Sequence, residues 1–185
     1  MNTVPFYFQL GFEHILQLGF DHILFILSLF LLSTNLKSLI WQATAFTVAH
    51  SITLALAMYN VISPTAAIVE PIIAISILIV AVQNVFSDKL KRSRIIIVFI
   101  FGLVHGMGFA GALKSLGLPE EQLTTALLGF NLGVELGQVT ILLIAWYLIG
   151  KWFSQKAWYR KRVIFPTSIA IALVALYWTI ERIWS

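Results

Sequence analysis

Six long apolar runs dominate the sequence and limit what the chain can fold into. The hydrocarbon core of a bilayer is about 30 Å thick, and a helix needs about 20 apolar residues to cross it. Runs of that length cover residues 12–33, 38–60, 66–87, 94–113, 123–149 and 163–183. Charged residues make up 11% of the chain, against about a quarter in a soluble domain. These features predict an all-α membrane protein, a bundle of six transmembrane helices.

The connections between the runs are short, so residues 1–185 are expected to form a single six-helix transmembrane domain. The segment before the first run lacks a basic stretch, and no small-residue cleavage site follows that run. We therefore interpret the first run as a retained helix and not as a cleaved signal peptide. The chain contains no cysteine, which excludes thiolate catalysis and thiolate metal ligands.

Basic residues are concentrated in every second connection. Ten of the 12 follow the first, third and fifth runs: Lys37, Lys89, Lys91, Arg92, Arg94, Lys151, Lys156, Arg160, Lys161 and Arg162. Because cytoplasmic loops carry an excess of Lys and Arg, these connections are expected in the cytoplasm and both termini outside. The basic charge therefore indicates orientation in a cytoplasmic (inner) membrane, as a multi-pass protein, and not binding to nucleic acid.

Glycines recur at short intervals in two of the runs. The fifth run contains Gly129, Gly133 and Gly137, and the fourth contains Gly102, Gly106, Gly108 and Gly111. Small residues spaced by four let helix backbones approach closely in a membrane. We expect the first set to pack inside the bundle, with a dimer seam as the alternative. The second set is expected to let the fourth helix bend.

Ionisable side chains interrupt the apolar runs. They are His14, Asp21, His22, His50, Glu70, His105 and Glu135, with Glu13 near the outer surface and the amides Asn84, Asn131 and Gln138. An ionisable group in the middle of the bilayer costs about 2.5–3.5 kcal/mol even on the insertion scale. We therefore expect these groups to face one interior site, where they satisfy one another.

The depth of each residue supports such a site. At ~1.5 Å per residue, the deeper groups lie about 12–18 Å below the outer ends of their runs. They are Asp21, His22, His50, His105, Asn131 and Glu135. His14 and Glu70 lie only about 3–6 Å down by the same rise. This distribution predicts a site near the midplane and a smaller station above it.

The stretch GFEHILQLGFDHILF repeats Gly-Phe-acid-His-Ile-Leu at a period of eight residues. In a continuous helix the second copy is turned by about 80° and displaced by about 12 Å, so the two copies cannot serve one ion on one face. His14 and Asp21 share a face, whereas His22 points about 100° away from Asp21. We interpret His14 as an outer ligand and Asp21 and His22 as members of the deep site; the alternative is a chance duplication.

Imidazoles and carboxylates without thiolates suit divalent ions such as nickel, cobalt or zinc. The predicted metal ligands are His14, Asp21, His22, His50, Glu70, His105 and Glu135, and the residues predicted to support them by hydrogen bonds are Asn131, Gln138 and Ser51. Asp21 either binds the ion directly or orients His22. Gln138 and Asn84 have the alternative role of joining helices.

Three segments carry the pattern of a known family: GFEHILQLGFDHILFIL, FTVAHSITLALA, and FGLVHGMGFAGAL followed by FNLGVELGQ. They resemble the HupE/UreJ family of membrane proteins, which are named as hydrogenase and urease accessory proteins and proposed as nickel or cobalt permeases. The resemblance extends from Gly11 to about Gln138. It implies a metal permease or metal-delivery protein that serves a partner in metalloenzyme maturation.

The fourth run departs from the permease motif of that family. Phe101 stands where the motif has its first histidine, and Gly108 stands where it has a glutamate. The His-to-Asp-His spacing in the first run is also one residue longer than the family pattern. If metal binds, Glu70, Glu135 and His50 must supply the missing ligands.

Three functions fit the sequence. The first is a permease or delivery protein, not an enzyme, that moves a divalent ion from outside to the cytoplasm. The second is an intramembrane zinc hydrolase acting on lipid or peptide, in which Ser51 or Ser76 lies near zinc bound by histidines. The third is a scaffold whose polar cluster only fixes helix register. The sequence has no nucleotide-binding motif, so transport would depend on the membrane potential, a proton gradient or a partner.

Overall fold

The computed structural model describes residues 3–63, 65–87, 94–115 and 120–184, and within these ranges every regular element is a helix. The long helices are α2 (Phe20–Leu32), α3 (Leu36–Met58), α4 (Ala66–Phe86), α5 (Arg94–Lys114), α6 (Leu123–Ala145) and α8 (Phe165–Trp184). The shorter elements are α1 (Thr3–Glu13), α7 (Lys151–Phe153), the 3₁₀ turn η2 (Glu120–Gln122) and the π-helical turns η1 (His14–Leu18), η3 (Trp146–Gly150) and η4 (Arg160–Ile164).

Five of the six predicted spans are continuous helices in the structure. They are Leu36–Met58, Ala66–Phe86, Arg94–Lys114, Leu123–Phe153 and Arg160–Trp184, each long and apolar enough to cross a membrane. The all-helical, multi-pass character predicted from the apolar runs is therefore confirmed. The predicted orientation stays a prediction, and three of its basic residues, Lys89, Lys91 and Arg92, lie outside the described residues.

The first predicted span differs from a single helix. It consists of two helical pieces, Val4–Gln17 and Phe20–Leu32, whose axes meet at 70°. Gly19 lies at the break with φ −100° and ψ 56°, outside the helical region. An added Cβ at Gly19 would lie 2.5 Å from the carbonyl oxygen of His14, so the tight approach of the two pieces requires glycine. The part of the chain that the structure describes therefore has five spans, or six if the bent pair counts as one.

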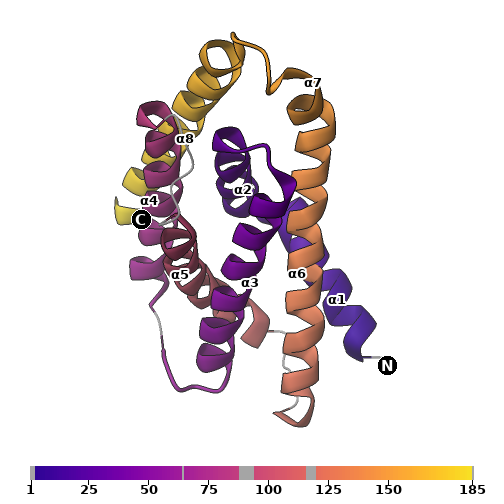
Figure 1. The fold of residues 1–185 in the computed structure, drawn as a ribbon. Coiled ribbons are helices and arrows are strands. Elements are labelled where there is room, and N and C mark those ends of the chain that lie inside the picture. Colours follow the sequence, from indigo (N-terminus) through magenta and orange to yellow (C-terminus); the bar gives the residue numbers. More distant parts are fainter. Residues whose placement is uncertain (1–2, 64, 88–93, 116–119, 185) are drawn as a thin grey trace.

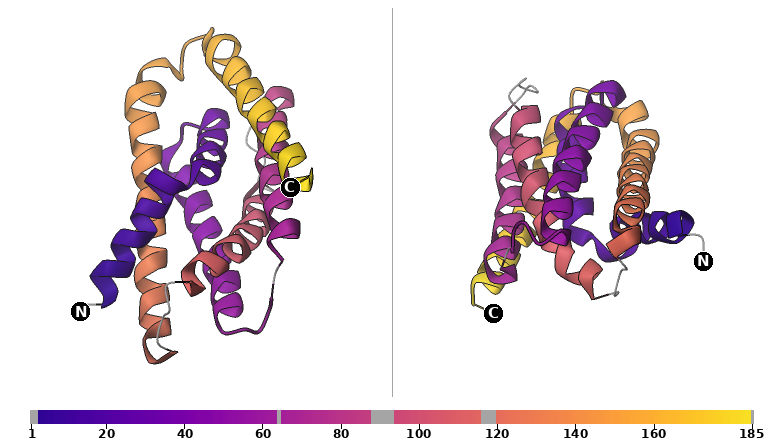
Figure 2. Two further views of the ribbon diagram at one scale, coloured as in Figure 1. Left: turned by 180° about the vertical axis from the view of Figure 1, so that it is seen from behind. Right: turned by 90° about the horizontal axis from the view of Figure 1, so that it is seen from below.

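Helix α2 occupies the middle of the bundle, where it contacts α3, α4, α6 and α8 (Figure 1). Around it other helices form three closely packed pairs: α3 with α5, α1 with α6, and α4 with α8. The views in Figure 2 show α1 crossing α6 obliquely on the flank of the bundle. Because α2 is enclosed on several sides, His22 in its first turn is buried, whereas Phe20 at its start is exposed.

The glycine ridge of α6 forms the contact with α1. An added Cβ at Gly133 would overlap the carbonyl oxygen of Phe8, and one at Gly129 would lie 2.9 Å from that of Val4. Gly11 of α1 makes the reciprocal approach, against the carbonyl oxygen of Phe130. The ridge thus packs inside the bundle, as predicted from the sequence.

Glycines also bring α5 against α3. An added Cβ at Gly106 would overlap the carbonyl oxygen of His50, and the Thr53 hydroxyl donates a hydrogen bond to the carbonyl oxygen of Leu103 at 2.7 Å. That these glycines let α5 bend stays a prediction; in the structure Gly102 and Gly106 lie directly against the α3 backbone. This close contact places His50 and His105 on neighbouring backbones.

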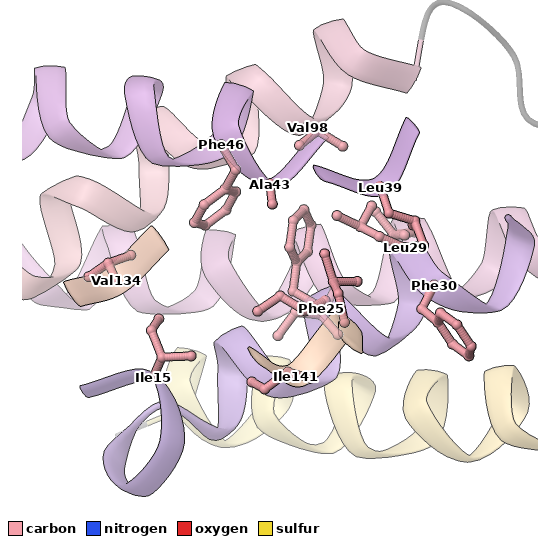
Figure 3. Packing of buried hydrophobic residues seen from close by; sticks show 14 of the residues in the cluster. Ile15, Phe25, Leu29, Phe30, Leu39, Ala43, Phe46, Val98, Val134 and Ile141 are labelled. Atoms are coloured by element: carbon pink, nitrogen blue, oxygen red, sulfur yellow. The ribbon is translucent and has the colours of Figure 1, made fainter. Parts of the chain in front are cut away.

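Below the start of α2 the interior is apolar. Figure 3 shows Phe25 and Leu29 of α2 packed towards Leu39, Ala43 and Phe46 of α3. This apolar layer fills the bundle on one side of the polar residues that α2 contributes at its N-terminal end.

The far end of α2 is fixed by a buried polar network. Arg94 is 3% exposed and donates to the Asn84 side-chain oxygen at 3.1 Å and to the Ser28 carbonyl oxygen at 3.0 Å. The Asn84 amide donates to the same Ser28 carbonyl at 2.7 Å. Asn84 therefore joins α4 to α2, the alternative role suggested for it from the sequence.

A Gly133→Ala substitution is expected to lower the free energy of unfolding by about 1–3 kcal/mol, because the new methyl group overlaps the α1 backbone. Unfolding the detergent-solubilised wild type and variant with heat or SDS measures this loss of stability. Gly111→Ala on α5 is the matched control, since nothing lies within 4 Å of an added Cβ there. Equal destabilisation of both variants would contradict the packing role of Gly133.

Candidate metal centre

The four histidines of the chain lie together in one buried cluster. His22 is central: its ring centroid lies 4.9 Å from that of His14, 5.0 Å from His105 and 6.0 Å from His50. The exposed fractions of the four side chains range from 0% to 8%. Imidazoles from η1, α2, α3 and α5 therefore meet at one place inside the bundle.

The break at Gly19 explains how His14 and His22 meet. A continuous helix would separate them by about 12 Å along its axis. In the structure His14 lies in the π-helical turn η1 and His22 in the first turn of α2, on the two sides of the bend. The predicted separation of His14 from the deep site assumed a continuous helix, and the structure instead places the two imidazoles side by side.

Ser76 on α4 determines which nitrogen of His105 carries a proton. The Ser76 hydroxyl donates its one hydrogen to the carbonyl oxygen of Ile73 at 2.7 Å. Its contact with His105 Nε2, at 3.1 Å, is then one in which the imidazole donates. The lone pair of His105 is consequently on Nδ1, which is buried and has no hydrogen-bond partner.

Asn131 on α6 determines which nitrogen of His50 carries a proton. The Asn131 amide nitrogen donates to the carbonyl oxygen of Leu127 at 2.8 Å, so its oxygen faces the imidazole. His50 Nδ1 lies 3.3 Å from that oxygen and is the donor in this contact. The lone pair of His50 is then on Nε2, which is also buried and without a partner.

The cluster thus contains several unpaired nitrogens. The buried imidazole nitrogens without a hydrogen-bond partner are His14 Nδ1, His14 Nε2, His22 Nε2, His50 Nε2 and His105 Nδ1. Leaving such atoms unpaired is costly, and neutral imidazole lone pairs are good ligands for divalent ions of the nickel, cobalt and zinc class. The donor set fits such an ion.

In this structure the donor nitrogens are not close enough together to bind one metal ion. Ligation needs nitrogens about 2.0–2.1 Å from one ion. Among the residues that the structure describes, no three His, Asp or Glu side chains converge in this way. Binding would require the imidazoles to turn towards one another from their present, mostly edge-to-face packing.

A cavity of about 220 Å³ leads to the cluster. Its lining includes the buried histidines 14, 22 and 105 and three more accessible charged residues, Asp21, Glu70 and Arg182. The charged residues form the mouth, because Glu70 is exposed and Asp21 and Arg182 are 22% and 21% exposed. The cavity thus has carboxylates at its mouth and imidazoles at its floor.

Arg182, near the end of α8, is a member of this site that sequence reasoning missed. Its Nη2 donates to both carboxylate oxygens of Asp21, at 3.1 and 3.0 Å. Its Nη1 donates to the carbonyl oxygen of Glu70 at 3.2 Å. One signal was available: an arginine in an apolar helix, away from the basic connections, needs an acidic partner.

Phenylalanines surround the imidazoles. Ring centroids lie 4.0 Å apart for His14 and Phe109, 5.0 Å for Phe46 and His105, and 5.4 Å for Phe25 and His105. Phe25 and Phe46 also belong to the apolar layer below the cluster (Figure 3). In the sequence these phenylalanines are indistinguishable from ordinary core residues.

The structure places three of the other predicted site residues elsewhere. A groove of about 400 Å³ between α3 and α6 is lined by Glu135, Ser51, Thr44 and Asn131. The Thr44 hydroxyl donates to Glu135 at 2.6 Å, and the Ser51 hydroxyl donates to the carbonyl oxygen of Thr47 at 2.6 Å. Gln138 accepts from the Thr47 hydroxyl at 3.5 Å and so joins α6 to α3. Of the groove residues, Asn131 is the one that contacts an imidazole.

Comparison with known protein families identifies the family of this chain. A family model described as HupE / UreJ protein matches residues 1–182, which includes the last helix beyond the motifs noted above. That family is linked to nickel and cobalt accessory or transport functions. No curated protein and no solved structure matches the chain. The match over almost the whole sequence shows that this multi-pass membrane protein belongs to the HupE/UreJ family.

Proposed function

We propose that the protein is a permease, or metal-delivery protein, that carries a divalent ion of the nickel and cobalt class across the inner membrane. The observation that carries this proposal is the cavity with acidic groups at its mouth and buried imidazoles at its floor. A cluster that only held helices together would pair its nitrogens, whereas here one nitrogen or more on each imidazole is unpaired.

The mouth and the floor have different roles in this proposal. Asp21 and Glu70 attract the hydrated cation and replace part of its water with carboxylate and carbonyl oxygens. His14, His22 and His105 line the cavity below and take the ion as their rings turn towards it, with His50 adjoining His22. Glu135, which hydrogen-bonds Thr44 in a separate groove, has no direct role as a ligand here.

The direction of transport follows from the predicted orientation. Glu70 lies near the start of α4 and Arg182 near the end of α8, which are both outer ends if the basic connections are cytoplasmic. The mouth then opens to the outside. A divalent cation moving inward gains about 4.6 kcal/mol per 100 mV of membrane potential, twice the value for a unit charge. The imported ion would supply metalloenzyme maturation.

The zinc hydrolase alternative gains no support from the hydroxyl groups. Ser76 contacts His105, but its hydrogen is donated to the Ile73 carbonyl. Ser51 lies in the groove between α3 and α6, where it donates to Thr47. Neither serine is therefore free to act at an ion bound between the imidazoles.

Metal content of the detergent-purified protein, measured by mass spectrometry after loading with nickel or cobalt, tests the proposal. We expect bound metal that exchanges with a chelator, and a decrease of at least about tenfold in His50→Ala and His105→Ala, since a ligand contributes no less than its supporting residues. Glu13→Gln is a matched control from the first copy of the repeat, because Glu13 hydrogen-bonds Gln9. A stoichiometric, chelator-resistant zinc ion would instead favour the hydrolase, and no metal under any loading condition would exclude both.

The hydrogen bond between Ser76 and His105 gives a second prediction. Ser76→Ala is expected to weaken nickel or cobalt affinity about 10–100-fold, the usual effect of removing a group that orients a metal-binding imidazole. Ser76→Thr keeps a hydroxyl and should retain most of the affinity. Titration calorimetry of the purified variants measures both.

Ser51→Ala is the matched control for that experiment. It removes the same hydroxyl from a serine whose hydrogen bond goes to the Thr47 carbonyl oxygen of the α3 backbone. The positioning role of Ser76 is wrong if the two alanine variants bind metal equally well.

A further inference from the structure

We propose that Arg182 is a built-in competitor for the transported ion: its guanidinium occupies the carboxylate of Asp21, and an entering divalent cation must displace it. This inference rests on the proposed function and assigns a role to a residue outside the histidine cluster. It predicts that removing the positive charge tightens metal binding.

The contacts of Arg182 show that it fills a cation position. Its Nη2 lies 3.1 and 3.0 Å from the two carboxylate oxygens of Asp21. These two oxygens are the ones a metal ion at the mouth would use. Guanidinium is always protonated in proteins, so it cannot release Asp21 by losing its proton and must move away.

The position of Arg182 at the mouth makes this competition effective. The residue lines the same cavity as His14, His22 and His105. Arg182 and Asp21 are partly exposed, so the pair is solvated enough to exchange. An ion bound by Asp21 and the imidazoles together would be held tightly, and transport needs an ion that is also released. By returning to Asp21, Arg182 removes one ligand and favours release.

Arg182 also connects three helices across the mouth. It joins α8 to α2 through Asp21 and to α4 through the carbonyl oxygen of Glu70, at 3.2 Å. Its guanidinium lies 5.4 Å from the ring centroid of Trp178. Displacement by a metal ion would therefore free the end of α8 and change the surroundings of Trp178.

The test is cobalt binding, measured by titration calorimetry, to wild type, Arg182→Gln, Asp21→Asn and the double variant. We expect Arg182→Gln to tighten binding about tenfold, because the competing unit charge is lost. Asp21→Asn should weaken binding, and in that background Arg182→Gln should tighten it less than about threefold, because no carboxylate is left to release. Arg182→Lys, which keeps the charge but not the planar guanidinium, should tighten binding less than Arg182→Gln does.

If Arg182 has only a structural role, Arg182→Gln should not tighten cobalt binding. If Arg182 only holds the helices together, Arg182→Gln weakens binding or leaves it unchanged while wild type binds metal, and the inference is overturned. Equal tightening with and without Asp21 overturns it too, because Arg182 would then act by simple repulsion. Absence of cobalt binding in all four proteins instead refutes the proposed function, and with it this inference.

A second measurement uses wild-type Arg182 and does not depend on the neutral variant folding. Zinc, which has a filled d shell, should change the tryptophan fluorescence of the wild-type protein as the guanidinium leaves Trp178. The change should be lost in Trp178→Phe and in His22→Ala. A fluorescence change that persists in Trp178→Phe, or its absence when zinc binding is shown by calorimetry, overturns the displacement of Arg182.

Discussion

The break at Gly19 is the constraint on which the site depends. A straight helix through residues 12–33 would carry His14 and His22 to different depths and different faces. The 70° bend between Val4–Gln17 and Phe20–Leu32 brings the two rings to 4.9 Å. A side chain at position 19 would meet the His14 carbonyl oxygen and the His22 ring, so glycine is what lets the two halves of the repeat meet. The same bend turns α2 into the middle of the bundle, where the other helices surround it.

Four imidazoles buried in an apolar bundle need hydrogen-bond partners, and several of their nitrogens have none. Ser76 and Asn131 each hydrogen-bond one imidazole, and their own donors are already used on backbone carbonyls, which fixes the tautomers of His105 and His50. The remaining nitrogens have no hydrogen-bond partner, and phenylalanine rings pack against the imidazoles that carry them. The tautomers of His50 and His105 are therefore fixed, while each of the four imidazoles keeps at least one unpaired nitrogen. In a membrane interior, where no water compensates, such a cluster is a strong sign of function.

The sequence predicted the features that depend on a single physical rule. Hydropathy predicted five spans closely, the glycine ridge predicted a close helix contact, and the cost of buried ionisable groups predicted that the histidines converge. It failed where the backbone departs from regular geometry, because Gly19 in a Gly-Phe repeat looks the same in a straight and in a broken helix. Arg182 was missed because its partner Asp21 is 161 residues away in the chain. Glu135 was assigned to the cluster from its depth, from the cost of burying a charge and from the ligands missing from the family motif, and none of these shows which partner on α3 it meets.

Corresponding residues in the two copies of the repeat have partly similar roles in the structure. Gly11 lies against the backbone of α6 and Gly19 against that of η1, so each glycine allows a close approach. Both histidines enter the cluster, but Glu13 hydrogen-bonds Gln9 on its own helix while Asp21 pairs with Arg182 at the mouth. The ion pair of Asp21 and Arg182 thus lies at the mouth of the cavity, and Phe25 and Phe46 pack against His105 inside it. If the protein carries an ion as proposed, the ion would meet the guanidinium of Arg182 on entry and the rings of Phe25 and Phe46 beyond the imidazoles.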